Sequence, residues 1–302
     1  MTTPTQSSMS ISIVVIEVAG GQALAACLES IQRFSLDSVI AVLREDSPQL
    51  ESRFRNVHFV HARESVPLRR KRGVELACTE VVVLIEDTTL PDASLLEGLA
   101  EVFAAECNVA ASGSVRLARD LPARYQALAC TEYGRYHERN IYPDTEPKLT
   151  IAERLPGNFI CYRRSALMEV LASHDEGLVE GVINHQLRLK GANLVMSPKL
   201  ANTYTAKDSW GARLATRMHH GWIYAGNEAA NKRFPQRVLQ LAKSFLLPVV
   251  LSLRAIRFMT KMQEIQSPAG VMLWICILEI FWSAGEIVGS VAGPPASMEH
   301  WR

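Results

Sequence analysis

Short apolar runs alternate with segments of helical spacing in the first 105 residues of the chain. Four runs of aliphatic and β-branched residues are typical of buried strands: 11–18, 38–43, 57–62 and 80–85. Between them, the spacing of Leu24, Cys27 and Ile31 predicts one helix, and the segment 69–78 predicts another. Strands that alternate with helices predict an α/β fold around a mainly parallel sheet.

The most apolar of these strands, 80–85, is followed directly by Glu86 and Asp87. Ligands of open α/β sheets bind beyond the carboxyl ends of the strands, so these acids stand where a site is expected. The alternative is that one of them caps the next helix, 93–105. Asp92 is the better candidate for that cap, so a structural role does not explain Glu86 and Asp87.

The second half of the sheet is expected after a polar segment. Residues 116–156 show no clear period, which fits either a substrate-side insertion or a solvated face. The segment 157–172 then predicts a glycine turn, a strand and a helix. The segment 175–198 predicts a helix that stops at Gly191 and a final strand.

The composition changes near residue 231. From 231 to 263 the chain has no acidic residue, whereas seven basic residues interrupt an apolar sequence: Lys232, Arg233, Arg237, Lys243, Arg254, Arg257 and Lys261. That pattern is typical of a basic amphipathic helix on an anionic membrane surface. We therefore divide the chain into a domain at 1–230 and a membrane-associated segment at 231–302.

An apolar stretch at 269–293 is long enough to cross a bilayer. Glu279 and Glu286 interrupt it and, being seven residues apart, share a helix face that should turn toward protein or water. The alternative is a buried helix of a soluble domain. A span at 235–252 would place the following basic residues on the far side, so an interfacial helix before one spanning or re-entrant helix fits better.

Charge and cysteine usage exclude some classes of protein. The net charge of +1 gives no general attraction to nucleic acid, so no nucleic-acid partner is expected. The six cysteines lack zinc-site spacing and are interpreted as core thiols in a reducing compartment. The first ten residues do not resemble a secretory signal, and we expect the catalytic part in the cytoplasm.

Several stretches together resemble a family 2 glycosyltransferase with the GT-A fold. They are 11–31, 70–99, 157–181, 217–230 and the ending 282–295. Their order and spacing carry the resemblance, which covers nearly the whole chain. It implies a GT-A Rossmann-like, mixed and mainly parallel sheet flanked by helices, followed by C-terminal membrane-associated helices.

The resemblance implies an inverting hexosyltransferase that uses a nucleotide-diphosphate sugar. In the family, the acidic motif after the strong strand binds a divalent cation and the ribose, and this places Glu86 and Asp87 at the donor, with Asp87 on the metal. The cation, Mg²⁺ or Mn²⁺, would offset the charge that builds on the leaving diphosphate. Thr88 stands where the family motif ends in a third acid. A hydroxyl is a weaker, neutral ligand, so the affinity for the metal would be reduced.

Glu180 matches the family's catalytic base, which takes the proton of the acceptor hydroxyl. The family commonly has a Glu-Asp pair here, whereas this chain has Glu180-Gly181. The alternative is an ordinary first-turn glutamate, favoured by the helix dipole. Gly157 and Asn158 match the family's acceptor-binding turn.

Other donor contacts follow from the same resemblance. Arg70 falls where members carry an arginine near the diphosphate and ribose, the alternative being a solvated helix charge. Glu45 or Asp46 would hold the nucleotide base, although paired aspartates are usual there. Two adjacent histidines, His219 and His220, are more simply a surface pair than diphosphate ligands.

The predicted function is sugar transfer to a lipid-linked or polysaccharide acceptor at the cytoplasmic face of the inner (plasma) membrane, in polysaccharide or glycolipid synthesis for the cell envelope. The alternative is a catalytically degenerate member that acts as a non-catalytic partner in a membrane assembly, suggested by Thr88, Gly181 and the altered acids at 45–46. A sugar nucleotidyltransferase would need a basic residue in the first glycine turn, and 19–26 has none.

Overall fold

The computed structural model describes residues 9–143, 146–206, 209–230 and 232–295. The chain divides into two compact units. The first consists of 1–114 and 147–202, and the second of 115–146 and 203–302. The boundaries of these units differ from those of the predicted segments 1–230 and 231–302.

The first unit is an α/β layer structure. Its elements are β1 (Ile11–Ile16), α1 (Gly21–Ile31), β2 (Ser38–Leu43), α2 (Pro48–Arg53), β3 (His58–His61), α3 (Val66–Leu76), β4 (Val81–Glu86), β5 (Thr89–Pro91), α4 (Leu95–Phe103), β6 (Asn108–Ser112), β8 (Thr150–Ile151), β9 (Phe159–Arg163), α7 (Arg164–Leu171), α8 (Glu180–Leu189), β10 (Asn193–Met196) and the short 3₁₀ helix η2 (Pro198–Leu200).

The main sheet has the strand order β3-β2-β1-β4-β9-β6-β10-β8. Strands β1, β2, β3 and β4 run parallel, as do β6 and β10, whereas β9 is antiparallel to both β4 and β6. The predicted mixed, mainly parallel sheet is confirmed. Because Ile16 is paired with Glu86, the loops that follow β1 and β4 leave the sheet side by side.

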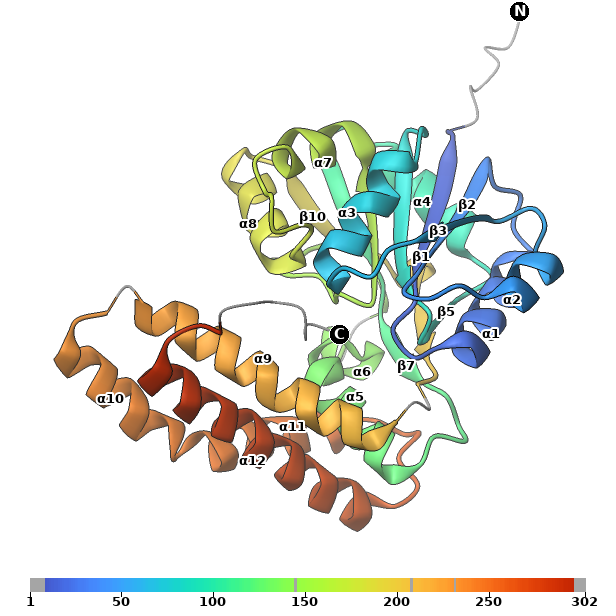
Figure 1. The fold of residues 1–302 in the computed structure, drawn as a ribbon. Coiled ribbons are helices and arrows are strands. Elements are labelled where there is room, and N and C mark those ends of the chain that lie inside the picture. The colour runs from blue at the N-terminus through green and yellow to red at the C-terminus, as the bar shows by residue number, and fades with distance from the viewer. Residues whose placement is uncertain (1–8, 144–145, 207–208, 231, 296–302) are drawn as a thin grey trace, which may run out of the picture. The chain divides into compact units, whose positions relative to one another are not determined.

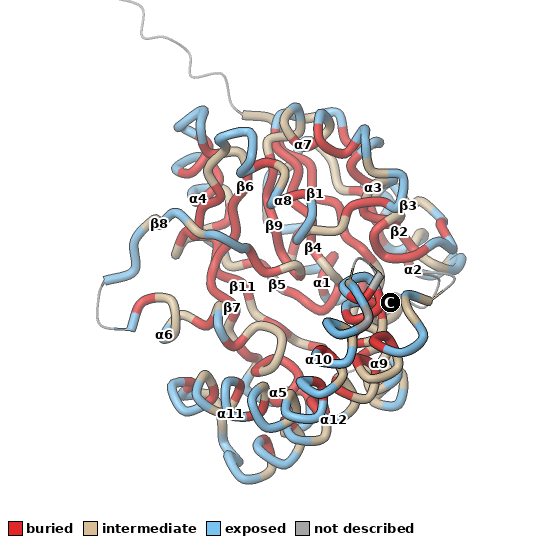
Figure 2. Tube along the Cα trace, turned by 90° about the vertical axis from the view of Figure 1, so that its left-hand side faces the viewer, coloured by how far each residue is buried: buried red, intermediate tan, exposed pale blue. Residues whose placement is uncertain are grey.

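Helices cover both faces of this sheet (Figure 1). Alternate residues such as Ile13, Val15 and Val83 pack in one core with helices α1, α2 and α4. Helices α3, α7 and α8 cover the opposite face, where a Cβ on Gly73 of α3 would lie 2.2 Å from Cγ1 of Val14. Figure 2 shows the central strands as the buried part of this unit.

The second unit is mainly helical. Its elements are β7 (Val115–Leu117), α5 (Ala123–Glu132), the 3₁₀ helix η1 (Gly134–Tyr136), α6 (Glu138–Ile141), β11 (Asn202–Tyr204, of which Asn202 ends the first unit), α9 (Trp210–Ala230), α10 (Phe234–Ser244), α11 (Leu247–Met259) and α12 (Pro268–Ala292). The expectation of an irregular segment at 116–156 was wrong for α5. Every residue from 125 to 130 is buried, so this helix has no polar face and hence no amphipathic period.

Helices α9 and α12 pack with their backbones in contact, side by side in Figure 1. A Cβ on Gly285 would lie 1.8 Å from the carbonyl oxygen of Met218, and one on Gly289 would lie 2.3 Å from that of Trp222. On the facing helix, a Cβ on Gly221 would lie 2.1 Å from the carbonyl oxygen of Trp282. Glycines on both helices therefore set how closely they approach.

The two glutamates of α12 are buried, as their spacing predicts. Glu279 accepts a hydrogen bond of 2.9 Å from Nη2 of Arg217, whose guanidinium carbon also lies 4.6 Å from the ring centre of Trp282. Glu286 accepts one of 2.7 Å from Nε1 of Trp282. Both carboxylates thus have partners within the helical unit.

Among the described residues, α12 is the one helix that is long and apolar enough to cross a membrane. Helices α10 and α11 together would also be long enough, but they bend by 52° at the break between them. The two helices and the break between them carry a row of large apolar side chains that are 50% to 66% exposed: Val238, Leu239, Phe245, Leu246, Val249, Val250 and Leu253. The segment predicted as one basic amphipathic helix is therefore two helices with a sharp bend between them, and their apolar side chains are exposed.

Candidate functional site

Asp87 holds the loop that follows β1. Its carboxylate accepts four hydrogen bonds of 3.0 to 3.1 Å from the backbone N–H groups of Val18, Ala19 and Gly20. Gly20 has a φ of +103°, a conformation that suits glycine. Asp87 is fully buried, and its hydrogen bonds hold this loop at the place where β1 and β4 end.

The pKa of Asp87 is raised from 3.8 to about 7, mainly by burial and also by the charge of Glu86, while the backbone hydrogen bonds lower it. Between these values the folded chain holds a proton that the unfolded chain has lost. The contribution of this group to the free energy of unfolding is therefore present at low pH and falls as pH rises toward 7. In urea denaturation, wild type should lose more stability between about pH 5 and pH 8 than Asp87→Asn. If the free energy of unfolding changed with pH equally in the two proteins, the raised pKa assigned to Asp87 would be wrong.

Arg70 joins two carboxylates that are far apart in the sequence. Its Nη2 donates to Oε1 of Glu86 over 2.7 Å and to the carbonyl oxygen of Gly157 over 3.2 Å. Its Nη1 forms an ion pair with Oε1 of Glu180. The side chains of Glu86 and Glu180 are 15% and 19% exposed, against 5% for Arg70. One buried guanidinium thus pairs with two acids that reach the surface, and one negative charge remains in excess.

The close contact between α3 and the sheet positions this arginine. Gly73 lies one turn after Arg70, and its missing side chain lets α3 approach Val14 of β1. The neighbouring Arg69, also buried, donates through Nη1 to the carbonyl oxygen of Glu17. The start of α3 therefore contacts the loops after both β1 and β4.

Gly157 and Asn158 lie beside this ion-pair cluster. Asn158 is fully buried, and its Nδ2 donates over 3.0 Å to both Oγ1 of Thr89 and Oδ1 of Asn202. Its carbonyl oxygen accepts from the N–H of Glu86 over 2.9 Å. Asn158 therefore fixes the backbone on which Glu86 stands. A Cβ on Gly157 would lie 2.2 Å from Oε1 of Glu180.

Gly157→Ala is expected to displace the Glu180 side chain from Arg70, because a Cβ cannot remain 2.2 Å from a carboxylate oxygen. The carboxylate is the end of a flexible side chain and can move aside, so the cost is mainly the lost ion pair, about 1 kcal/mol in the free energy of unfolding, measured by urea denaturation. Gly181→Ala is the matched control, since a Cβ there meets nothing within 4 Å. In a helix that change should stabilise by about 0.5 to 1 kcal/mol. Equal effects of the two variants would contradict the packing described.

The two acids predicted to bind the nucleotide base form no hydrogen bond or ion pair with the Arg70 cluster among the described residues. Glu45 and Asp46 follow β2, and both are exposed. Asp46 forms a 3.1 Å contact with Nδ1 of His61, whose Nε2 lies 3.1 Å from Oε1 of Glu51. They stand at the same sheet edge as β1 and β4, and their assignment to the nucleotide base stays a prediction.

Sequence reasoning missed Arg69, Tyr162 and Asn184. The Tyr162 hydroxyl donates over 2.9 Å to Oδ1 of Asn184, which lies one helical turn after Glu180 on α8. Burial, together with the charge of Glu180, raises the pKa of Tyr162 well above its usual range. The four-residue spacing of Glu180 and Asn184 was the available signal, because it places both on one face of α8.

The described residues contain no group of three or more His, Cys, Asp or Glu side chains that could hold a metal ion. Asp87 already uses both oxygens on backbone N–H groups, so a cation there would compete with the loop. Glu86 is partly exposed and can supply one oxygen ligand. Mg²⁺ sites of phosphate-transfer enzymes often need only one or two carboxylates, because the substrate phosphates supply further ligands.

The cluster can perform acid–base chemistry. A partly exposed carboxylate, Glu180, stands near a second one, Glu86, with one cation between them. Such an arrangement can accept a proton from a hydroxyl at the carboxyl edge of the sheet. Arg70 holds the two carboxylates in position, and the three groups together carry a net negative charge.

Comparison with known proteins shows the fold. No family model and no curated protein sequence matches the chain. Among solved structures, the chain is similar to the crystal structure of GalNAc-T7 with UDP, GalNAc and Mn²⁺, with a TM-score of 0.51 and 11% sequence identity. The match covers 75% of this chain and 52% of that one, so this chain spans about half the length of GalNAc-T7. It supports a GT-A glycosyltransferase fold.

Proposed function

We propose that this chain is an inverting glycosyltransferase that moves a hexose from a nucleotide-diphosphate sugar to a hydroxyl of a membrane-presented acceptor. The observation that carries the proposal is the cluster in which Arg70 bridges Glu86 and Glu180, beside the loop held by Asp87. The likeness to a structure that holds UDP and Mn²⁺ supports a nucleotide-sugar donor.

In the proposed reaction, Glu180 accepts the proton of the acceptor hydroxyl as its oxygen attacks the anomeric carbon. The bond between that carbon and the diphosphate oxygen breaks, and the bond to the acceptor oxygen forms on the opposite side, which inverts the configuration. The electron pair of the broken bond leaves with the nucleoside diphosphate. Arg70 lies between the two carboxylates and positions Glu180 for this step.

A divalent cation is part of the proposal. It would be held by Glu86 together with the oxygens of the donor diphosphate, and by Asp87 if the loop at 17–20 adjusts. When bound, it would supply Lewis-acid stabilisation of the leaving diphosphate. Glu45 or Asp46, which follow β2, would contact the nucleotide base. Gly157 would contact the acceptor, and the buried Asn158 would hold this turn in place.

A thermal-shift panel of nucleoside diphosphates, each with and without Mn²⁺, tests the donor site. One nucleotide at 100 times its dissociation constant should stabilise the chain by about 2.7 kcal/mol. The shift should require Mn²⁺ and should be lost in Glu86→Ala. Absence of a shift with every nucleotide would contradict the donor assignment.

The helical unit is proposed to bind the cytoplasmic face of the inner (plasma) membrane, where a lipid-linked or polysaccharide acceptor is presented. The exposed apolar row on α10 and α11 supports this, since basic side chains of the same helices would meet anionic lipid headgroups. Helix α12 is apolar enough to associate with the bilayer.

Val249→Glu combined with Leu253→Glu tests that membrane contact in the full chain. Both residues are more than 60% exposed, so the change should leave the fold intact. Flotation with vesicles that contain anionic lipid should decrease for this variant. Leu189→Glu, at a 68% exposed position of α8, is the matched control and should float like wild type. Unchanged flotation of the double variant would contradict the proposed surface.

A second candidate function is a non-catalytic partner in a membrane assembly. The engagement of both Asp87 oxygens by backbone amides favours it, as does Thr88 in place of a third acid. This candidate predicts no turnover of any nucleotide sugar by the purified chain. Turnover that disappears in Asp87→Ala would exclude it.

A further inference from the structure

A polar cavity lies within the helical unit, lined by residues on and after β7, by the start of α6 with the preceding His137, and by the segment between α11 and α12. Its volume is about 410 Å³, which is within the usual range for small-molecule sites. The charged side chains that line it are Arg116, Arg119, His137, Glu138, Arg139 and Glu264. Three guanidinium groups and two carboxylates leave one positive charge in excess.

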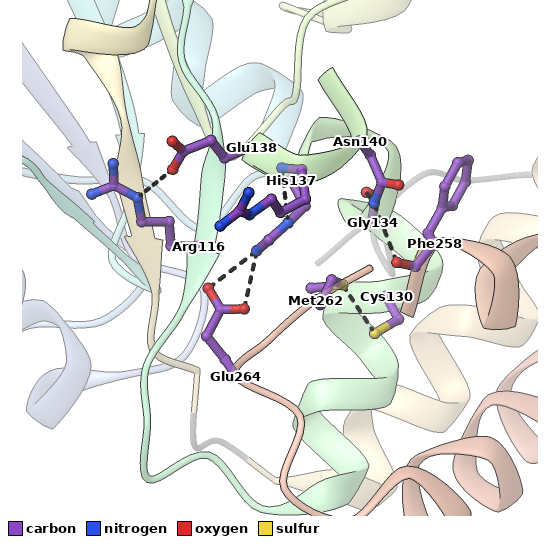
Figure 3. Close-up of polar contacts among 10 residues, drawn as sticks. Arg116, Cys130, Gly134, His137, Glu138, Asn140, Phe258, Met262 and Glu264 are labelled. Atoms are coloured by element: carbon purple, nitrogen blue, oxygen red, sulfur yellow. Dashed lines mark hydrogen bonds and ion pairs between the residues drawn. The ribbon is translucent and has the colours of Figure 1, made fainter. Parts of the chain in front are cut away.

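The acids of this cavity already have partners within its wall (Figure 3). Nε of Arg116 forms a 3.3 Å contact with Oε2 of Glu138. Both carboxylate oxygens of Glu264 lie 3.1 Å from Nε2 of His137. The hydrogen bond from His137 lowers the pKa of Glu264, with burial opposing and the charge of Arg116 assisting.

His137 is a fixed part of the wall. It is 3% exposed, and its Nδ1 accepts from the backbone N–H of Arg139 over 3.3 Å. Since Nδ1 accepts this bond, the ring N–H on Nε2 faces Glu264. The contact ties the start of α6 to the segment after α11, so the cavity is held by side chains from two distant parts of the sequence.

Arg119 and Arg139 carry the remaining positive charge. Both are exposed, and within the described ranges neither guanidinium makes an ion pair or a hydrogen bond. The backbone at Arg119 is held by Nε2 of Gln266, which donates to its carbonyl oxygen over 3.5 Å. Two guanidinium groups at one cavity mouth, with the acids already bonded elsewhere, favour an anion with several oxygens.

We propose that this cavity binds a phosphate group through Arg119 and Arg139, with Arg116 beside them. The phosphate belongs either to the head of a phosphorylated lipid, such as the acceptor, or to free phosphate. The lipid case rests on the proposed function, since it places the acceptor's phosphate in the unit that carries the apolar helices.

Isothermal titration calorimetry of the full chain in non-ionic detergent tests the proposal. The probes are dodecyl phosphate, inorganic phosphate and dodecanol. The test variant is Arg119→Gln combined with Arg139→Gln. The control is Arg135→Gln, which removes one positive charge from an exposed residue of η1 that does not line the cavity.

Dodecyl phosphate should bind wild type and Arg135→Gln equally, and at least about tenfold more weakly to the double variant, which is the loss of a charge-assisted pair. Dodecanol should not bind at this site. Stronger binding of dodecyl phosphate than of inorganic phosphate identifies a lipid, and equal binding identifies free phosphate; both support the site.

Two results would overturn the proposal: no binding of either phosphate probe to wild type, or equal binding to wild type and the double variant. The measurement uses no nucleotide sugar and no turnover. Absence of phosphate binding with normal sugar transfer would therefore reject the phosphate site and leave the proposed function intact. Phosphate binding without any sugar transfer would support the site and reject the proposed function.

Discussion

Glu180→Gln is expected to lower the turnover of sugar transfer by about a thousandfold, the usual contribution of a positioned general base. The amide keeps the size of the carboxylate and fits the space beside Gly157, but it cannot accept a proton. Nucleotide binding should change little, because Glu86 and the loop after β1 remain. The measurements are kcat from nucleoside diphosphate release and a dissociation constant from calorimetry.

Glu169→Gln is the control for this variant. Glu169 is 69% exposed on α7 and pairs with Lys190 over 2.6 Å, away from the Arg70 cluster. It should retain wild-type turnover and stability. If Glu180→Gln turned over at the wild-type rate, the proton acceptor would have to be another group, and the role assigned to this carboxylate would be wrong.

Gly285→Ala should destabilise the helical unit by about 3 kcal/mol, the upper part of the range for overpacking. The added Cβ would lie 1.8 Å from the carbonyl oxygen of Met218 and 2.8 Å from the backbone nitrogen of Trp222. Backbone atoms cannot rotate away as a side chain can, so α9 and α12 must separate. The measurement is urea or thermal unfolding of the full chain in non-ionic detergent, followed by helical circular dichroism.

Gly211→Ala is the matched control, because this glycine of α9 has nothing within 4 Å of the position of a Cβ. In a helix the change should stabilise by about 0.5 to 1 kcal/mol. Equal stability of Gly285→Ala and wild type would show that the two helices do not pack through this glycine.

Much of the α/β fold could be predicted from periodicity. The strand at Ser38–Leu43 was predicted at its observed bounds, and those at Ile11–Ile16 and Val81–Glu86 to within two residues. These strands are buried on both faces, so their sequences are continuous apolar runs that are easily detected. Helix α5 was not predicted, because a helix that is buried all round lacks a polar stripe.

The candidate site was predicted in part. Arg70, Glu86, Gly157 and Glu180 were each expected at a site, and the structure brings them together. The role of Asp87 as the acceptor for loop N–H groups was not predictable, because it depends on the register of β1 against β4. Hydrogen bonds that span almost 70 residues leave no local pattern.

The proposed transfer of sugar from a nucleotide sugar is tested most directly by incubating the purified full chain with Mn²⁺, a membrane lipid extract and each of a panel of nucleotide sugars labelled in the sugar. We predict that one donor releases nucleoside diphosphate in step with label entering an organic-soluble or polymeric product of inverted anomeric configuration. Intact nucleotide sugar with every donor, from a protein that is folded and membrane-bound, would contradict the account.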